Sequence, residues 1–194
     1  MKPVSNTSKD TQKRILDIAE QLLLTRGFNA FSYQHISSAL GVRNAAIHYH
    51  FPRKTDLGVA LVQRYRRRFG RFMEAHSALD PLQQLERYFE LTDAYFHQDE
   101  QICPSGILTT EFHTLPEEIQ QEASAFITEM RDWAKTIARR GREEGVMAYQ
   151  GSPDAMGELM FAALQGGLQL ARIDAGILDV IKQQIRDLLK VEKP

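Results

Sequence analysis

The chain has 194 residues, of which 43% are hydrophobic and 25% charged, a balance that excludes a disordered or fibrous protein. Its single cysteine, Cys103, excludes an intramolecular disulfide and fits the cytoplasm, the location that we expect. Residues 1–11 are polar and lack the apolar stretch of a secretory signal, and no run is long and apolar enough to span a bilayer. We therefore expect no membrane association.

The net charge of −1 conceals an uneven distribution along the chain. Residues 1–72 hold 13 Lys and Arg against 4 Asp and Glu, a net charge of +9, whereas residues 73–194 hold 11 against 21, a net charge of −10. A basic first third predicts a polyanionic partner, and the alternative is an uneven surface without function. For one set of cations we expect a solvated helix face or an interdomain brace: Arg64, Arg66, Arg67, Arg68 and Arg71.

Hydrophobic residues near the start of the chain repeat with the period of an α-helix. The repeat predicts a helix over residues 11–26 that Asp10 caps at its start and Gly27 ends. Its buried stripe comprises Ile15, Ile18, Ala19, Leu22 and Leu23. We expect Ser32 to begin a second helix and Gly41 to end it, because the following turn needs a positive φ. The inward residues of this second helix are Ile36, Ala39 and Leu40.

A third helix is predicted over residues 44–50 and ends before Pro52, because proline pushes the preceding residue out of the α region. A longer helix runs from Thr55 into the late seventies, and Asp80 with Pro81 opens the next. The rest is divided into helices by Pro104, Pro116, Gly145, Gly151 and Pro153. Since no stretch alternates long enough for a strand, the sequence predicts an all-α fold of about nine helices.

Residues 32–51 have the spacing of a helix-turn-helix, which places its second helix in the DNA major groove. Side chains expected to pack this pair on the first helix are Ile36, Leu40, Val42 and Ile47. Side chains expected to face the bases are Arg43, Asn44, Ala45, His48 and Tyr49. Side chains expected to hold phosphates are Ser32, Gln34, His50 and Lys54. A helical hairpin that binds nothing has a similar pattern, but the basic charge favours DNA.

A family resemblance is carried by Gly27-Phe28, Ser32, Ile36, Gly41-Val42 and residues 47–57, whose sequence is IHYHFPRKTDL. With this spacing, roughly the first 60 residues resemble the DNA-binding domain of TetR-type transcriptional repressors, although His48 stands where the family usually has tyrosine. The resemblance implies an all-α homodimer with a three-helix DNA-binding domain, here 1–54, and a larger effector-binding and dimerisation domain, 55–194. It implies DNA contacts at Ser32, Gln34, Asn44, Ala45, His48, Tyr49, His50 and Lys54.

The last two helices, expected at residues 153–174 and 176–191, are the candidates for the dimer interface. The final helix carries an apolar stripe of Ile177, Val180, Ile181, Ile185, Leu188 and Leu189. The helix before it carries small residues that permit close approach, Ala162, Ala163, Gly166 and Gly167. Such patterns also occur in the core of one chain, but the resemblance implies pairing through a four-helix bundle built from these helices.

Aromatic residues in the middle of the chain line either a plain core or an apolar effector cavity. They are Tyr88, Tyr95, Phe96, Phe112, Phe126 and Trp133, and His113 is the expected polar contact. Trp133 and His113 are favoured because their polar atoms need partners when buried. The predicted effector-binding residues are Cys103, Phe112, His113 and Trp133.

Cys103 precedes a helix that Pro104 opens, where free backbone amides favour a thiolate. The spacing of Cys103, Leu108 and Glu111 resembles a TetR subgroup, some members of which sense electrophiles or oxidants through this cysteine. The alternative is an inert, small hydrophobic residue near the effector pocket. Without a second cysteine, oxidation would stop at sulfenic acid, form an adduct or bridge two subunits.

No metal-binding, nucleotide-binding or hydrolase motif occurs in the sequence, so we expect no metal and no cofactor. The alternatives are a thiol enzyme using Cys103 and His113, which does not explain the basic first third, and a helical interaction module, which leaves the predicted outward helix face without a purpose. The sequence therefore predicts a non-enzymatic homodimeric repressor. It would bind a palindromic double-stranded operator and release it when a small-molecule effector or an electrophile occupies the C-terminal domain.

Overall fold

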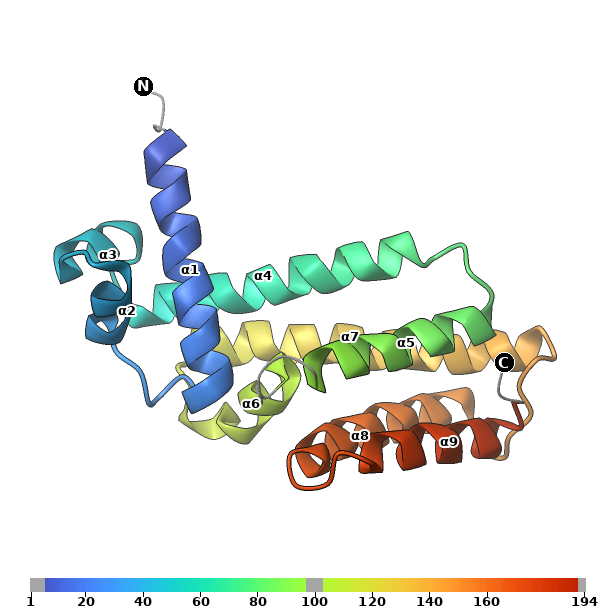
Figure 1. Ribbon diagram of the computed structural model, residues 1–194. Helices are drawn as coiled ribbons and strands as arrows, with labels where there is room; N and C mark the ends of the chain where they lie inside the picture. Colours follow the sequence, from blue (N-terminus) through green and yellow to red (C-terminus); the bar gives the residue numbers. More distant parts are fainter. Residues whose placement is uncertain (1–5, 97–102, 192–194) are drawn as a thin grey trace.

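The computed structural model describes residues 6–96 and 103–191 (Figure 1). Its elements are α1 (Asn6–Arg26), α2 (Tyr33–Leu40), α3 (Asn44–His50), α4 (Lys54–Ala75), α5 (Pro81–Phe96), α6 (Pro104–Thr110), the 3₁₀ turn η1 (Phe112–Thr114), α7 (Glu117–Glu143), α8 (Pro153–Ala171) and α9 (Ile177–Leu189). The described residues contain no strand, which confirms the predicted all-α class. Helices α1–α3 form one unit, here called the head, and α4–α9 form the larger body. None of the described helices combines the length and apolar character needed to cross a membrane.

The core of the head consists of side chains that the helical repeat places inward. Its fully buried members include Ile15, Ala19, Leu23, Ile36 and Ile47. Gly41 adopts a φ of +67° and its amide bonds to the Ser38 carbonyl oxygen, which lets the chain turn tightly from α2 into α3. The Tyr33 hydroxyl donates to the Phe51 carbonyl oxygen at 2.7 Å, so the start of α2 is tied to the end of α3.

Three details of the head differ from the prediction. Residues 6–9 are already helical, so Asp10 lies within α1 and is not its cap. Ala39 is exposed and Ser37 is buried instead, because the Ser37 hydroxyl is hydrogen-bonded within the head and is stable away from water. Val42 follows the glycine turn and is 36% exposed, so it does not pack on α1 as expected.

Helix α7 is the centre of the body, with α4 packed along it on one side and α8 on the other (Figure 1). The largest fully buried side chains around it are Leu57, Leu61, Leu85, Leu108, Ile119, Ile137, Met160 and Leu164. Gly157 allows α8 to approach α7 closely, since a Cβ there would come within 2.4 Å of the Lys135 Cα. Substitution of this glycine would therefore force the two helices apart.

Helix α9 is attached to α5 by charged side chains. Lys182 forms an ion pair with Asp93. The Arg186 guanidinium contacts Glu86 at 2.7 Å and lies 4.7 Å from the centroid of the Phe89 ring. Both cations are buried, so each depends on its carboxylate partner to offset the loss of water.

The apolar stripe predicted on α9 is divided between two faces. Ile185 and Leu189 are buried within the chain, whereas Val180 and Leu188 are 55% and 50% exposed. The expectation that all of these residues belong to one interface stripe is therefore wrong for Ile185 and Leu189. The two inner residues stabilise the fold of a single chain, and the two outer ones remain available to a partner.

Candidate DNA interface and effector region

Helix α3 presents one exposed face at the end of the head (Figure 1). This face carries the predicted base-reading residues Arg43, Asn44, Ala45, His48 and Tyr49, all of which are exposed. Tyr49 is the most prominent, with 78% of its surface exposed, while Ile47 on the other side of the helix is fully buried. The structure thus brings the five residues together on one surface, and their contact with DNA stays a prediction.

Local hydrogen bonds orient two side chains on this face. The Ser37 hydroxyl donates to Asn44 Oδ1 at 2.5 Å, which leaves the Asn44 amide hydrogens for another partner. His48 Nδ1 lies 3.2 Å from the Pro52 carbonyl oxygen, and its ring packs edge-on against Tyr33. Because a carbonyl oxygen only accepts, this contact places the proton of a neutral His48 on Nδ1 and leaves Nε2 as an acceptor.

The residues predicted to hold phosphates have different environments. Ser32 and Gln34 are exposed at the start of α2, and His50 is partly exposed at the end of α3. Lys54 is directed inward, where Nζ donates to the Phe28 carbonyl oxygen and lies 4.4 Å from the centroid of the Phe28 ring. Burial lowers the pKa of the Lys54 amine. A phosphate contact by Lys54 would require the amine to leave this site.

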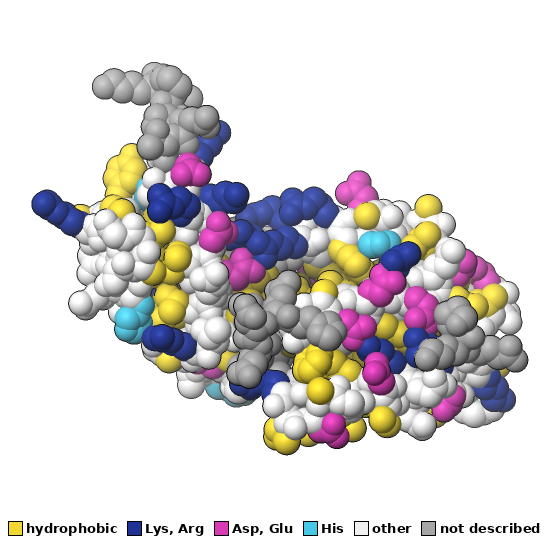
Figure 2. All heavy atoms as spheres, in the orientation of Figure 1, with side chains coloured by type: hydrophobic (Ala, Val, Ile, Leu, Met, Phe, Trp, Pro, Cys, Tyr) yellow, Lys and Arg dark blue, Asp and Glu magenta, His cyan; other side chains and the backbone are white. Residues whose placement is uncertain are grey.

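Three arginines of α4 form ion pairs with acidic side chains of neighbouring helices. The pairs are Arg64 with Asp17 and Glu20, Arg68 with Glu20, and Arg66 with Glu122 and Glu129. The first two arginines tie α4 to α1, and the third ties α4 to α7. The predicted interdomain brace is therefore confirmed for Arg64 and Arg68, whereas the ion pairs of Arg66 lie within the body. Figure 2 shows Lys and Arg side chains gathered over the head and the adjoining part of α4, with Asp and Glu side chains mostly over the body.

A second connection runs from the end of α6 to the turn after α1. The Glu111 carboxylate accepts hydrogen bonds from the backbone amides of Phe28, at 2.6 Å, and Asn29, at 3.4 Å. The Asn29 side chain donates to the Thr114 hydroxyl at 2.8 Å. Gly27 has a φ of +87°, and a Cβ there would come within 2.4 Å of Glu111 Oε1. Glycine is therefore required at this turn both by its backbone conformation and by the close carboxylate.

Cys103 lies at the opposite end of α6, directly before its first residue. Its sulfur accepts a hydrogen bond from the Gly106 amide at 3.2 Å and donates to Gln165 Oε1 at 3.3 Å. Ser105 also donates to this oxygen, at 3.1 Å. The side chain is 3% exposed, and burial raises the pKa of the thiol despite the hydrogen bond from the amide. The thiol form therefore predominates at neutral pH.

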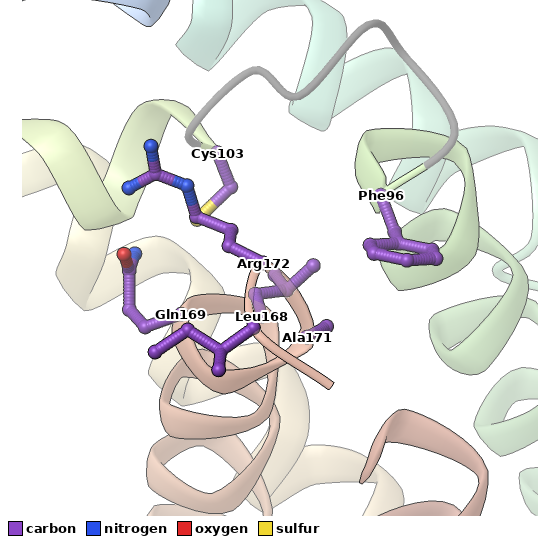
Figure 3. Close-up of a pocket in the computed structure, with 7 residues that line it drawn as sticks. Phe96, Cys103, Leu168, Gln169, Ala171 and Arg172 are labelled. Atoms are coloured by element: carbon purple, nitrogen blue, oxygen red, sulfur yellow. The ribbon is translucent and has the colours of Figure 1, made fainter. Parts of the chain in front are cut away.

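Cys103 borders a cavity of about 490 Å³ between the ends of α5, α6 and α8 (Figure 3). The cavity is lined by Phe96, Cys103, Leu168, Gln169, Ala171, Arg172 and Ile173. Arg172 and Cys103 both line this cavity, so a cation and a thiol are available to an occupant (Figure 3). The volume falls within the range of small-molecule sites, which is about 300–1,000 Å³.

The other predicted effector residues are separated from this cavity. Phe112 is half-buried and His113 exposed in η1, beside the contact between Glu111 and the head. The expectation that His113 is a buried polar contact is therefore wrong, because α6 ends at Thr110 and the next turn runs along the surface. Trp133 is buried on α7 and packs edge-on against Phe72 and Tyr88, as a core residue does.

Comparison with known proteins shows which family this chain resembles. A family model described as bacterial regulatory proteins, tetR family, matches residues 15–61, from α1 into α4. A solved TetR-family transcriptional regulator from Agrobacterium tumefaciens is 30% identical with a TM-score of 0.88, and the match covers 94% of this chain and 98% of that one. The chain belongs to the TetR family. This TetR-family chain is a DNA-binding transcriptional regulator, which confirms the predicted class.

Two curated relatives align with this TetR-family chain over most of their length. The HTH-type transcriptional repressor NemR from Escherichia coli K12 is 24% identical over 182 residues, covering 87% of each chain. The transcriptional regulator AcuR from Cereibacter sphaeroides is 24% identical over 160 residues, covering 78% of this chain and 72% of AcuR. Both relatives are named as regulators of transcription.

Sequence reasoning missed two contacts of this TetR-family regulator. The spacing analysis singles out Glu111 but assigns no partner to it, and its partner Phe28 is 83 positions away. Gln165, which holds Cys103 and Ser105, is likewise more than 60 positions from Cys103. A local pattern carries no information about such contacts, and the only signal was the unusual grouping of Cys103 and Glu111 around one short helix.

Proposed function

We propose that this TetR-family regulator is a homodimeric repressor that leaves its operator when a small molecule occupies the body. The observation that carries the proposal is the position of α6. One end of this seven-residue helix holds Cys103 at the cavity, and the residue after its other end, Glu111, holds the Phe28 amide of the head. Residues 1–54 would then be the DNA-binding domain, and residues 55–194 the effector-binding and dimerisation domain.

The DNA-facing roles follow from exposure and chemistry. Arg43 offers a guanidinium suited to guanine, Asn44 an amide suited to adenine, and Ala45 permits close approach. Tyr49 and His48 supply a hydroxyl and a ring acceptor on the same face. Residues proposed to hold phosphates are Ser32, Gln34, His50 and, after release of its amine from Phe28, Lys54.

Exposed apolar side chains on the last two helices support the proposed dimer. On α8 they form a stripe with small residues between them, Leu159, Ala162, Gly166 and Leu170, and Ile173 follows just after the helix. On α9 the outer face adds Val180 and Leu188. A stripe of this kind, with small residues at its centre, fits a symmetric four-helix pairing with a second copy.

The proposed switch is a movement of α6. A ligand in the cavity beside Cys103 displaces the start of this short helix, and Glu111 transmits the displacement to the turn after α1. The two heads of the dimer would then no longer match the spacing of the half-sites. Burial of the Cys103 thiol favours a non-covalent effector over an electrophile, because only the thiolate reacts efficiently.

The decisive test is selection of bound duplexes from a random pool, followed by affinity measurements across salt concentrations. We expect a palindromic consensus and a steep fall of affinity with salt, because phosphate contacts release counterions. Asn44→Ala should weaken binding to the selected site by about 1–3 kcal/mol and binding to random DNA by less. Gln150→Ala, in an exposed loop of the body, is the matched control. A pool that shows no sequence preference would contradict the proposed function.

A further inference from the structure

A second cavity lies between the head and the body, beside α1. Its volume is about 300 Å³, and its walls come from α1, α4, α5 and α7. Its apolar character comes from Leu24, Phe69, Phe72, Leu91, Tyr95 and Phe126, and we call it the aromatic cavity. Aromatic walls suit an apolar ring, since rings bury a large area and pack favourably edge to face.

The charged side chains of the aromatic cavity neutralise each other. Arg68 and Glu20 both line it, and they form an ion pair. The Glu20 side chain is only 15% exposed, so the pair is partly withdrawn from water. The other described residues that line the cavity carry no charge, so a charged group held among them would have no counter-charge, which is costly. The aromatic cavity therefore favours an uncharged occupant.

A small void adjoins the aromatic cavity, and three described residues line both: Leu91, Tyr95 and Met130. The void measures about 10 Å³, room for a single oxygen-sized group. The Thr92 hydroxyl at this void already donates to a backbone carbonyl at 2.9 Å, and the Ser105 hydroxyl donates to Gln165.

Tyr88 also lines this void, and its hydroxyl, unlike those of Thr92 and Ser105, is not hydrogen-bonded within the part of the chain that the structure describes. Tyr88 is 2% exposed, and its hydroxyl has no hydrogen-bond partner among the described residues. Buried hydroxyl groups in folded proteins nearly always have a partner, because the loss of water is otherwise uncompensated. An acceptor atom placed in the void would complete the hydrogen bonding of Tyr88.

We propose that the aromatic cavity and the void form one binding site for an uncharged molecule with an aromatic ring and a carbonyl oxygen. The ring occupies the aromatic cavity, and the oxygen accepts a hydrogen bond from Tyr88. Met130 lines both spaces and can adapt to an occupant of both, because its side chain is flexible. Leu24 belongs to α1, so the occupant touches the head directly. Control of DNA binding through this contact rests on the proposed function.

The chain contains its own reporter for this site. Trp133 is the only tryptophan, and its ring centroid lies 5.3 Å from that of Tyr88 and 5.8 Å from that of Phe69. The full-length protein is titrated with 4-phenylbutan-2-one, an aryl ketone, while tryptophan fluorescence is recorded. Butylbenzene, which lacks the oxygen, and 3-phenylpropanoate, which carries a charge, are compared. We expect saturable ketone binding at least about tenfold tighter than that of the carboxylate.

Two variants locate the ketone within the site. Tyr88→Phe removes only the unpaired hydroxyl and should weaken ketone binding by about 3- to 10-fold while leaving butylbenzene binding unchanged. Ala94→Phe fills the mouth of the aromatic cavity and should weaken both ligands by about tenfold or more. Ala155→Phe places the same side chain on the exposed first turn of α8 and should change neither.

The site is overturned if the ketone does not bind saturably, or if Ala94→Phe binds it as tightly as the unaltered protein. Equal losses of ketone and butylbenzene in Tyr88→Phe overturn the assignment of the oxygen to Tyr88. Operator affinity is measured separately with and without the ketone. Ketone binding that follows the expected pattern but leaves operator affinity unchanged supports the site and overturns its control of DNA binding, whereas the switch proposed at the cavity beside Cys103 is not affected by that result.

Discussion

At the scale of single residues, burial decides what Cys103 can do. A thiol at the start of a helix, next to free amides, would ionise readily if water reached it. The Cys103 sulfur is instead held between Gly106 and Gln165 in the interior, and burial raises the pKa of the thiol. Its hydrogen bonds therefore serve to begin α6 and to join it to α8, which favours the structural interpretation over the electrophile sensor.

This interpretation predicts slow chemistry at Cys103. N-ethylmaleimide at pH 7 should modify the folded protein at least about tenfold more slowly than the chain unfolded in urea. The raised pKa also means that the thiol stabilises the fold below the ordinary thiol pKa, about 8.5, and that this contribution is lost as the pH rises above it. Mass spectrometry of the Cys103 adduct gives the rates. Rapid modification at pH 7 that releases DNA, and that Cys103→Ser abolishes, would contradict the prediction.

At the scale of elements, the helix ends that were predicted best are those marked by a proline or a glycine. Pro81, Pro104 and Pro153 each occupy the first position of a helix, where a missing amide hydrogen costs nothing. Unmarked ends were placed less well. Helix α1 includes residues 6–10, ahead of the apolar repeat, because an established helix gains one backbone hydrogen bond per added residue without any apolar side chain. Helix α4 ends at Ala75, before the late seventies.

In the candidate site, too, local features were predicted from the sequence and long-range contacts were not. The outward face of α3 follows from helical period and was predicted residue by residue, because period is a local property. The inward turn of Lys54 and the contacts of Glu111 depend on Phe28, which the fold brings near from a different part of the chain. The unpaired hydroxyl of Tyr88 depends on packing that no spacing rule describes.

The link between α6 and the head can be measured without an effector. Glu111→Ala removes the acceptor of two backbone amides and should lower the free energy of unfolding by about 1–3 kcal/mol. Hydrogen exchange at Phe28 and Asn29 should accelerate, while exchange at the buried Ile15 should rise only with the loss of global stability. Glu117→Ala, at the exposed start of α7, is the control. Unchanged exchange at Phe28 in Glu111→Ala would show that this contact does not hold the head.

At the scale of the whole molecule, the inner and outer faces of the last two helices have different environments. Their inner faces complete the core of one chain through Leu164, Leu178 and Ile185, and their outer faces expose an apolar stripe. The sequence pattern merges both faces into one stripe, because apolar residues occur on both sides of α9. Only the three-dimensional arrangement separates the residues that fold the chain from those that remain free to pair.

This separation predicts opposite outcomes for two neighbouring substitutions. Leu188→Asp should leave the helical content and thermal unfolding of each chain nearly unchanged but yield monomers in sedimentation and lose high affinity for the palindrome. Ile185→Asp buries a charge and should destabilise the fold itself by about 4 kcal/mol or more. Val146→Asp, an exposed apolar residue before α8, is the control and should remain a dimer. A Leu188→Asp protein that sediments as a dimer would exclude this face as the interface.

The buried ion pairs of α9 determine the order in which such a dimer assembles. A cation withdrawn from water is stable only when its carboxylate is already in place, and Lys182 and Arg186 both find theirs on α5 of the same chain. We therefore expect α9 to stay docked on its own chain when two chains pair. In the proposed dimer, pairing would follow folding as a separate bimolecular step, so dilution alone should lower the fraction of chains able to bridge two half-sites.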